Sequence, residues 1–569
     1  MTAMPTRRRG NAMMAIIAII ALVVIAAVVY MLMKPGGKKP GGIMESGLKM
    51  APATSQIFVA MDFAPVYDEA KQKELLDAFK QTQVFKNMSD ELKSEGLNLE
   101  EEILSWAKPS MALALAPLEG KPSIFTDIEN AKVPPFTGFL LIGVRDDAKA
   151  KESLEKLMGK AKIKFKNEDH KGAKLWIPEK GVDDGPTIAL APGMLIVGIK
   201  DTDVKAALDG PKASLAEAPN YKAAMGKIKH QDVLVMYGDL QGMIKGAEAA
   251  LKEIPPEAAE LKKLVEGIRY LAAGAGTDGK DLVSEVMVSI DPAASGKLAS
   301  LIFKPSFGID IKSAELYPAE AEMYGSLNLK MLWQMIYDCM GEFPETAQMR
   351  DMPAQQLSMG GIDLQKNILD PLTGELAYSV DGYGKVFSQS LEQVSQGEQP
   401  DPADQMEMLQ EMPVVMALGL ANKAEIEGLI NKNIPEPVRA TFKKEEHNGV
   451  TIYNVEGQFY YAMTDDFMLL GINEASEAMK KMIDAKKSGK NIKSLPGFGR
   501  IMGMLGADKP VYFQYMDIKK VYGEAGNELA KSDPGMAKLL QLAGDYQGTW
   551  QAGALRADGF YMVSLTTRK

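Results

Sequence analysis

A glycine-rich segment is the part of this chain that looks most like a site for chemistry. Residues 274–281 read Gly-Ala-Gly-Thr-Asp-Gly-Lys-Asp, which resembles the loops that bind the phosphates of nucleotides. Such a loop needs a helix directly after it, because the free amides of the helix N-terminus bind the phosphate. Here residues 282–288 have the pattern of a strand, and Asp281 would repel a phosphate. We therefore predict a hairpin turn and no nucleotide.

Two Ser-x-x-Lys strings match the nucleophile element of serine acyl-enzymes. They are Ser46 with Lys49, in a predicted tether, and Ser153 with Lys156, well inside a lysine-rich amphipathic helix and not at its start. Neither position presents a serine as acyl-enzyme chemistry requires. We predict no catalytic residue.

The weak candidates for metal binding are His170, His447, Met406, Met408 and Met412. The two histidines each precede a hairpin turn beside two acidic residues, and a metal would require them to converge from separate parts of the chain. More simply, each imidazole is a partly exposed turn residue that hydrogen-bonds nearby backbone. We assign no metal and no cofactor.

Methionine is unusually frequent, with 37 residues against 18 phenylalanines and 18 tyrosines. Thioethers are soft ligands for copper(I), but they also fill irregular cores and line adaptable apolar grooves. The spacing leaves three alternatives open: core packing, a groove for a lipid-like or peptide ligand, and copper.

Composition limits the classes of partner. The chain has 569 residues, 46% of them hydrophobic and 25% charged, with a net charge of −10. An acidic balance argues against nucleic acid, which requires a basic surface. The single cysteine, Cys339, excludes an intrachain disulfide, so the fold must rest on its core.

An uncharged run at residues 12–33 lies between Arg7, Arg8 and Arg9 and Lys34. As a helix it would span about 33 Å, enough to cross the hydrocarbon core of a bilayer. We expect a single-pass signal anchor in the bacterial inner membrane, with residues 1–11 cytoplasmic and the bulk of the chain outside the cytoplasm. Residues 34–50, which begin with glycine, proline and lysine, are interpreted as a tether.

The rest of the chain contains two similar halves. Residues 165–172, Phe-Lys-Asn-Glu-Asp-His-Lys-Gly, correspond to residues 442–449, Phe-Lys-Lys-Glu-Glu-His-Asn-Gly. Other segments match in the same order, including Pro52 with Pro318 and residues 287–290 with residues 562–565. We predict a tandem duplication, with the first repeat at 51–305 and the second at 306–569.

Within each half, short strands alternate with amphipathic helices such as residues 147–161. Two-residue turns at Lys171-Gly172 and Asn448-Gly449 are typical of type I′ hairpins. Residues 388–412, rich in Gln, Glu, Asp and Pro, are expected to form an acidic loop. The predicted fold class is α+β: a transmembrane helix, then two homologous lobes of mainly antiparallel sheet with packed helices.

These features resemble a bacterial family known as domain of unknown function number 3352, whose members look like single-anchor envelope proteins. The resemblance rests on Pro52-Ala53-Thr54 before the strand 57–63, a helix ending at Trp106 before the strand 111–115, and residues 141–144 before a lysine-rich helix. The family brings no established catalytic residues.

The sequence therefore favours a non-catalytic interaction or scaffolding protein of the bacterial envelope. The alternative is a carrier or chaperone for a hydrophobic ligand held between sheet and helices, and an envelope hydrolase is less favoured. The expected partners are the membrane through residues 12–33 and an envelope protein or lipid-like ligand, without nucleic acid or nucleotide.

Overall fold

The computed structural model describes residues 42–62, 69–94, 98, 100–118, 120–121, 124, 136–160, 164–179, 186–246, 259–342, 346, 349–395, 412–457, 459–473 and 475–568. Contacts divide the chain into two compact units. Unit 1 consists of Met1–Glu253 with Ile268–Ser289, and unit 2 of Ile254–Gly267 with Ile290–Lys569.

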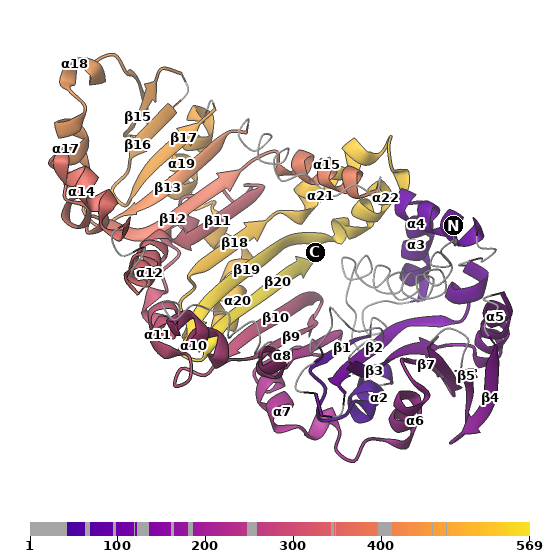
Figure 1. The fold of residues 1–569 in the computed structure, drawn as a ribbon. Coiled ribbons are helices and arrows are strands. Elements are labelled where there is room, and N and C mark those ends of the chain that lie inside the picture. Colours follow the sequence, from indigo (N-terminus) through magenta and orange to yellow (C-terminus); the bar gives the residue numbers. More distant parts are fainter. Residues whose placement is uncertain are drawn as a thin grey trace, which may run out of the picture. The chain divides into compact units, whose positions relative to one another are not determined.

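Unit 1 has helices and strands in alternation (Figure 1). In chain order they are α2 (Ile43–Met50), β1 (Ile57–Asp62), α3 (Glu69–Lys80), α4 (Gln83–Ser94), η1 (Glu100–Leu104), β2 (Ala107–Pro117), β3 (Phe136–Val144), α5 (Asp147–Lys160), β4 (Phe165–His170), β5 (Ala173–Pro178), β6 (Thr187–Ala191), β7 (Met194–Gly198), α6 (Asp201–Asp209), η2 (Leu215–Glu217), α7 (Pro219–Met225), β8 (Leu234–Gly238), α8 (Leu240–Gly246), β9 (Ile268–Asp278) and β10 (Asp281–Ile290).

Unit 2 begins with α10 (Ala259–Gly267) and continues after β10. Its further elements are α11 (Gly296–Ile302), η4 (Pro305–Phe307), η5 (Lys312–Glu315), β11 (Met323–Asn328), α12 (Leu329–Gly341), α14 (Met352–Met359), η6 (Leu364–Leu369), β12 (Leu372–Val380), α15 (Tyr383–Ser395), β13 (Val414–Leu420), α17 (Lys423–Asn433), α18 (Glu436–Arg439), β14 (Lys443–His447), β15 (Val450–Val455), β16 (Phe459–Met463), β17 (Phe467–Ile472), α19 (Ser476–Ser488), η7 (Ile492–Ser494), α20 (Pro496–Leu505), β18 (Tyr512–Met516), α21 (Ile518–Leu529), α22 (Pro534–Leu542), η8 (Ala543–Asp545), β19 (Tyr546–Arg556) and β20 (Gly559–Arg568).

Both units follow the same path through an antiparallel sheet. In unit 1 the strand order is β10-β9-β8-β1-β2-β3-β7-β6-β5-β4, and in unit 2 it is β20-β19-β18-β11-β12-β13-β17-β16-β15-β14. Irregularities recur too. A bulge interrupts β2 between Ala107 and Met111 and β12 between Leu372 and Leu376, and a π-helical turn precedes each bulged strand.

Small polar links recur at matching places in the two units. Pro52 forms an isolated bridge with Ser214, as Pro318 does with Asn491. The buried side chain of Gln56, before β1, accepts a hydrogen bond from the Ile124 amide at 3.0 Å.

Glu322 has the equivalent position before β11. Its buried carboxylate accepts hydrogen bonds from the amides of Gly382 and Gly384, the latter at 2.9 Å. In each unit, one buried side chain thus anchors the segment that follows β2 or its counterpart β12.

The hairpin turns predicted from the sequence are confirmed. His170 pairs with Ala173 and His447 with Val450, which leaves two residues in each turn. The turn residues have positive φ, 48° and 80° at Lys171 and Gly172, and 51° and 84° at Asn448 and Gly449. Two consecutive positive φ angles are the geometry of a type I′ turn.

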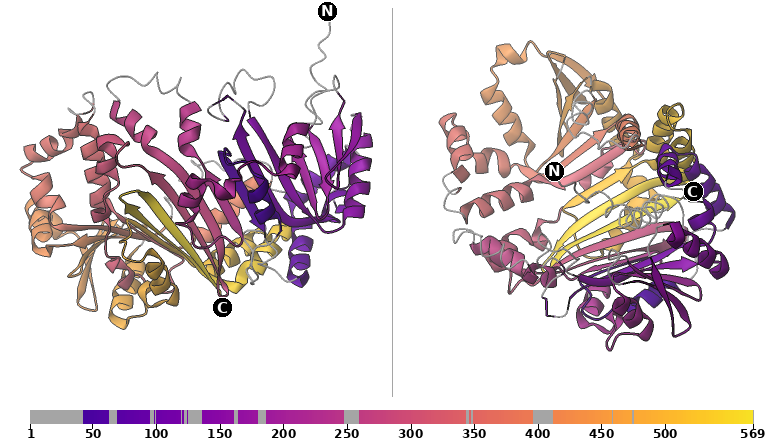
Figure 2. Two further views of the ribbon diagram at one scale, coloured as in Figure 1. Left: turned by 90° about the horizontal axis from the view of Figure 1, so that it is seen from below. Right: turned by 45° about the vertical axis from the view of Figure 1, so that its right-hand side comes forward.

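In unit 2, α19 and α20 cover one face of the sheet, and glycines let them approach closely. A Cβ on Gly471 of β17 would lie 2.5 Å from Ala475 Cβ, next to α19. A Cβ on Gly497 of α20 would lie 2.0 Å from the indole nitrogen of Trp550, on β19. Figure 2 shows these helices on one side of the sheet and α12 and α14 on the other.

The predicted fold class was wrong in one respect. Of the residues that the structure describes, none belong to a helix long and apolar enough to cross a membrane. The longest helix among them, α5, has 14 residues and is amphipathic, because helices of this fold cover a sheet with one face only. Residues 12–33, where the transmembrane helix was predicted, lie outside the described residues. The fold class is α+β, with helices packed on antiparallel sheet.

Three predicted segments have other structures. Residues 43–50, assigned to the tether, form α2, in which Ile43, Met44 and Gly47 are buried. Residues 388–395, expected in an acidic loop, belong to α15, because Phe387 stacks on Tyr522 of α21 at 5.5 Å. Residues 259–267 and 290–305, assigned to the first repeat, pack with unit 2.

A substitution at Gly325 of β11 tests how closely side chains pack on the face of the unit 2 sheet opposite α19 and α20. A Cβ there would lie 2.4 Å from the ring of Tyr378, the residue paired with it on β12. We expect Gly325→Ala to lower the free energy of unfolding by about 1–3 kcal/mol, since the ring must move. Chemical denaturation of the full chain measures this.

Gly428→Ala is the matched control. Gly428 lies inside α17, and a Cβ there would meet nothing within 4 Å. Alanine is the better helix former by up to about 1 kcal/mol, so this variant is expected to be as stable as wild type or more so. Equal destabilisation by both variants would contradict the proposed packing.

Candidate functional site

The two histidines that the sequence singled out form the same contact, once in each unit. His170 Nε2 lies 2.8 Å from Asp209 Oδ1 at the end of α6. His447 Nε2 lies 2.7 Å from Asp484 Oδ1 on α19. Each imidazole therefore binds a carboxylate of the neighbouring helix, whereas the sequence had led us to predict a hydrogen bond to the nearby backbone.

These pairs fix each hairpin tip to a helix. In unit 1, Lys171 also binds Asp209 at 3.1 Å, and the hydrogen bonds from Lys171 and His170 lower the pKa of the Asp209 carboxyl. In unit 2, Asn448 replaces Lys171 and donates to Asp484. Asp209 and Asp484 are largely exposed, so each pair is a surface contact with little net energy.

The described residues contain no group of three or more His, Cys, Asp or Glu that could hold a metal ion. His170 belongs to unit 1 and His447 to unit 2. Met406 and Met408 lie outside the described residues. Met412 is half-buried, and its carbonyl accepts a hydrogen bond from Asn473 Nδ2 at 3.0 Å.

The other sequence motifs have structural explanations. The glycine-rich segment joins β9 to β10, so the strand that we predicted at residues 282–288 is confirmed. Ser153 is buried within α5. Lys156 forms an ion pair with the buried Glu102 at 2.5 Å, which raises the pKa of Lys156. A raised pKa is the opposite of what a lysine needs to act as a base.

Unit 1 also contains a more buried histidine contact. His230 Nδ1 lies 2.8 Å from Glu285 Oε2 on β10, and the same carboxylate oxygen accepts hydrogen bonds from the amides of Lys229 and His230. The hydrogen bond to Glu285 raises the pKa of His230, against the effect of burial. No local pattern indicates this pair, because 55 residues separate its members.

The raised pKa makes a prediction about pH. Because the folded-state pKa is above the unfolded value of about 6.5, the contribution of His230 is fully present below that value and is lost as pH rises through the folded-state pKa. We expect the stability difference between wild type and His230→Asn to be largest at acidic pH and to shrink at alkaline pH. Denaturation at several pH values measures it.

Proton NMR of the three histidines gives an independent readout. We expect one imidazole to titrate above the ordinary range and its signal to be absent from His230→Asn. A constant stability difference from acid to alkaline pH would contradict the assignment.

The second face of the unit 2 sheet is the largest feature that the sequence motifs did not predict. Strand registers place a set of apolar side chains on the face opposite α19 and α20. They are Met323, Leu327, Leu376, Tyr378, Val414, Met416, Leu418, Met468, Leu470, Ile472, Met463, Phe459, Tyr453 and Val455. All are half-buried except Phe459, which is 39% exposed. We call this set the apolar sheet face.

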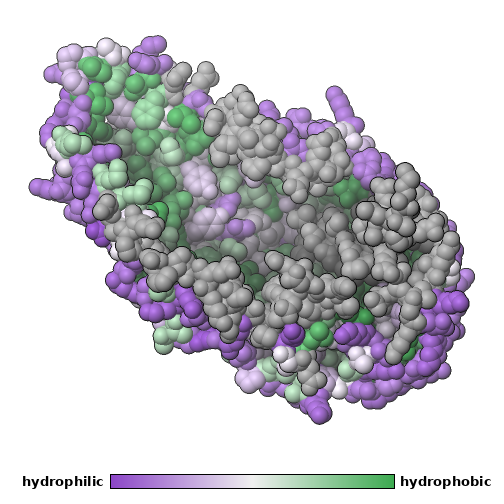
Figure 3. Space-filling view, in the orientation of Figure 1, coloured by the Kyte–Doolittle hydropathy of each residue, from purple (hydrophilic) through white to green (hydrophobic). Residues whose placement is uncertain are grey.

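Figure 3 shows hydrophobic residues gathered on a hollowed part of the surface over β12–β17. Along the described strands β11–β13 and β15–β17, this face carries no charged side chain. Lys444 of the edge strand β14 is beside it, with its ammonium 5.6 Å from the centre of the Tyr453 ring. The face can therefore offer dispersion contacts and a few hydroxyl groups, but almost no charge.

Tyrosines of this face lie in a poorly hydrated environment. Burial is the main cause that raises the pKa of Tyr378 and of Tyr461, and it raises that of the neighbouring Tyr512 to about 12. Tyr453 and Tyr461 stack with centroids 4.6 Å apart and planes 6° apart. Desolvation disfavours the phenolate, so the hydroxyls of Tyr378, Tyr461 and Tyr512 stay neutral donors and acceptors.

The same face becomes polar on the neighbouring strands β18, β19 and β20. Gln514 pairs with Gln551, which pairs with Ser564, and Thr549 pairs with Thr566. The two threonine hydroxyls lie 2.8 Å apart. We call these five half-buried, uncharged residues the polar strip.

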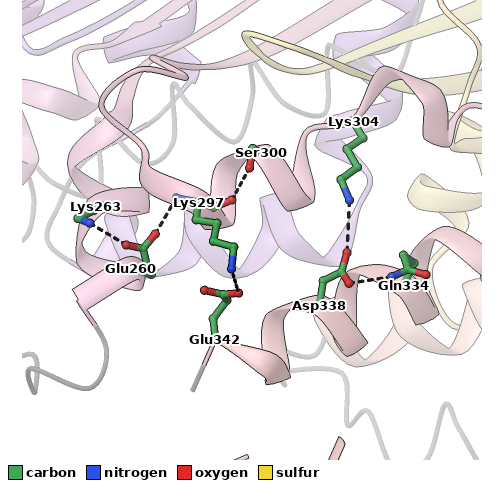
Figure 4. A network of polar contacts seen from close by, with 8 residues as sticks. All are labelled: Glu260, Lys263, Lys297, Ser300, Lys304, Gln334, Asp338 and Glu342. Atoms are coloured by element: carbon green, nitrogen blue, oxygen red, sulfur yellow. Dashed lines mark hydrogen bonds and ion pairs between the residues drawn. The ribbon is translucent and has the colours of Figure 1, made fainter. Parts of the chain in front are cut away.

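A polar network positions α12 beside the apolar sheet face (Figure 4). Glu342, just after α12, binds Lys297 of α11 at 2.5 Å, and Asp338 binds Lys304 at 3.3 Å. Gln334, Asp338 and Glu342 follow each other at intervals of four, so they share one side of the helix. Helical spacing puts Leu329 and Ile336 on the other side, where they are 38% and 51% exposed.

Fold and surface together define a class: an α+β protein of two units with one strand order, whose second unit has an apolar sheet face that is half-buried among the described residues. The chain belongs to the family described as "Protein of unknown function (DUF3352)", which matches residues 14–382.

No curated protein matches the chain. Solved structures described as crystal forms III, IV and I of TP0453 are similar to it at 10%, 12% and 9% identity. The matches cover 45%, 45% and 43% of this chain and 79%, 81% and 78% of the other, with a TM-score of 0.23 in each case. A likeness of this degree carries no argument about function.

Proposed function

We propose that this chain is a non-catalytic protein of the bacterial envelope that holds a hydrophobic ligand on the apolar sheet face of unit 2. One observation carries the proposal: on six neighbouring described strands, large apolar side chains are half-buried, and no charged side chain lies among them on that face. Soluble proteins rarely keep such contiguous surfaces without a use for them. A ligand bound there would remove the remaining exposed apolar surface of the sheet face from water, which is favourable.

The composition of the apolar sheet face supports ligand binding over a fixed internal contact. Met323, Met416, Met463 and Met468 have flexible, polarisable side chains that adapt to the shape of what they contact. Neutral tyrosine hydroxyls add a few oriented polar groups, as is usual in ligand sites.

The proposed location rests on the sequence. The uncharged residues 12–33, with arginines before them, favour attachment to the inner membrane and placement of both units outside the cytoplasm. A hydrophobic ligand would be abundant at that surface. Protease added to spheroplasts should then remove both units, and protection of the units until lysis would overturn this placement.

Photolabelling of the full chain in mild detergent tests the binding role. The probe is a long-chain alkane that carries a diazirine, and labelled peptides are mapped by mass spectrometry. We expect labelling of β12, β13 and β17 in wild type. Leu470→Lys should reduce it about tenfold, because a cation in this face costs more than about 1.4 kcal/mol to desolvate.

Ser488→Lys is the matched control, because it adds the same charge at an exposed position of α19, beyond the opposite face. It should label as wild type does. Equal labelling of all three proteins, with equal thermal midpoints, would overturn the proposed function.

A scaffolding role is the second candidate, favoured by one observation. Met349, Met352 and Met359, on and just before α14, are 57%, 47% and 83% exposed. Exposed apolar residues on a helix are typical of protein contacts. These three methionines are not members of the apolar sheet face, and they differ from it in being exposed and not half-buried.

Chemical cross-linking in membranes distinguishes the two roles. For the scaffold, Met352→Glu with Met359→Glu should abolish a cross-linked protein partner and leave alkane labelling of β12, β13 and β17 unchanged. If no partner is cross-linked to wild type, the scaffolding candidate is rejected.

A further inference from the structure

The apolar sheet face and the polar strip form two adjoining parts of one surface. Register continues directly across the division: Gly325 of β11 pairs with Tyr378 on the apolar side and with Gln514 on the polar side. Gln514 is followed by Gln551 and Ser564, and Tyr512 donates a hydrogen bond to Gln514 Oε1. The surface is therefore apolar across β11–β13 and β15–β17 and rich in neutral hydrogen-bonding groups across β18–β20.

We propose that the ligand is a diacyl lipid with an uncharged polar end, whose acyl chains lie on the apolar sheet face and whose ester and hydroxyl groups meet the polar strip. This inference rests on the proposed function, and it names the ligand class and its orientation. Three observations support it.

The first concerns the sheet backbone. Strands β11, β12, β13, β15, β16 and β17 each pair on both sides, so their amides and carbonyls are committed to the sheet. An extended peptide laid flat on this face would find few partners for its own amides, and each buried orphan costs about 1–3 kcal/mol. A hydrocarbon chain has no such groups, so the surface fits acyl chains better than a peptide.

The second concerns the division of the surface. A pure hydrocarbon would leave Gln551 and Ser564 covered without partners, which is unfavourable. A glycerol ester offers carbonyl acceptors and a hydroxyl beside its chains, and the amide and hydroxyl groups of the polar strip can bind both kinds.

The third concerns charge. The five members of the polar strip are uncharged. The guanidinium at the end of β20, that of Arg568, lies 5.3 Å from the centre of the Tyr546 ring, and the strip itself has no cation of the kind that phosphate recognition usually employs. The net charge of −10 also disfavours an anionic head group. A neutral lipid such as diacylglycerol therefore fits better than an anionic phospholipid.

The experiment uses the full chain in mild detergent with two probes that carry the same diazirine acyl chain, diacylglycerol and phosphatidylglycerol. The alkane probe is run beside them. We expect diacylglycerol to label β12, β13 and β17 and to compete about tenfold better than phosphatidylglycerol. Gln514→Met with Gln551→Met should reduce diacylglycerol labelling about tenfold and leave alkane labelling unchanged.

Each outcome supports or overturns a particular statement. Equal diacylglycerol labelling of wild type and the double variant overturns the orientation, and better labelling by phosphatidylglycerol overturns the neutral head group. Displacement of diacylglycerol by an unfolded polypeptide at equal concentration overturns the choice of lipid. In all these cases the proposed function survives as long as Leu470→Lys still reduces alkane labelling about tenfold.

Two controls keep the test decisive. Ser488→Lys should behave as wild type with every probe. If the double variant does not fold, judged by circular dichroism and its thermal midpoint, Gln551→Met alone or Ser564→Ala takes its place, and each should weaken diacylglycerol but not alkane labelling.

Discussion

Close packing of helices on one side of the unit 2 sheet is the constraint that determines which of its faces is buried and which is only half-buried. Gly471 and Gly497 have no side chain at the positions that Met479 and Trp550 occupy, so α19 and α20 pack closely on that side. Both faces of the unit 2 sheet are apolar, and among the described helices α19 and α20 bury the side chains of one of them. The other keeps its methionines and tyrosines half-buried, and its use by a ligand follows from that.

The two units share a topology but use it differently. The anchor before the first strand is the neutral Gln56 in one unit and the charged Glu322 in the other. The loop before β8 holds His230 against Glu285, whereas the loop before β18 holds Asp508 against Arg556 at 2.7 Å. The strand path is the same in both units while these polar contacts differ, which is expected when the path is fixed by the core and turns.

The repeated His–Asp contact shows how a conspicuous residue can have a structural role. Each histidine stands at a hairpin tip whose position is set by a type I′ turn, and each aspartate stands near the end of the helix that follows the hairpins. The pair joins two elements that are also linked by ion pairs, Glu168 with Lys205 in unit 1 and Glu445 with Lys480 in unit 2. Both members of each pair are solvent-accessible, so the contact fixes the position of a hairpin tip and adds little net stability.

The sequence by itself determined much of the local structure, because turns and amphipathic helices are set by neighbours along the chain. Asn448-Gly449 dictated its hairpin, and the spacing in residues 147–160 dictated α5. It did not determine α15, since residues 388–395 look polar until Phe387 finds Tyr522 on α21.

Only the tertiary structure decided which sheet face stays open. In residues 414–420 and 467–472 both alternating sets of side chains are apolar. The alternation of side chains along these strands therefore does not predict which face of the sheet is buried. Which face is buried depends on where helices that are distant in sequence pack against the sheet. That is a property of packing, and no local pattern records it.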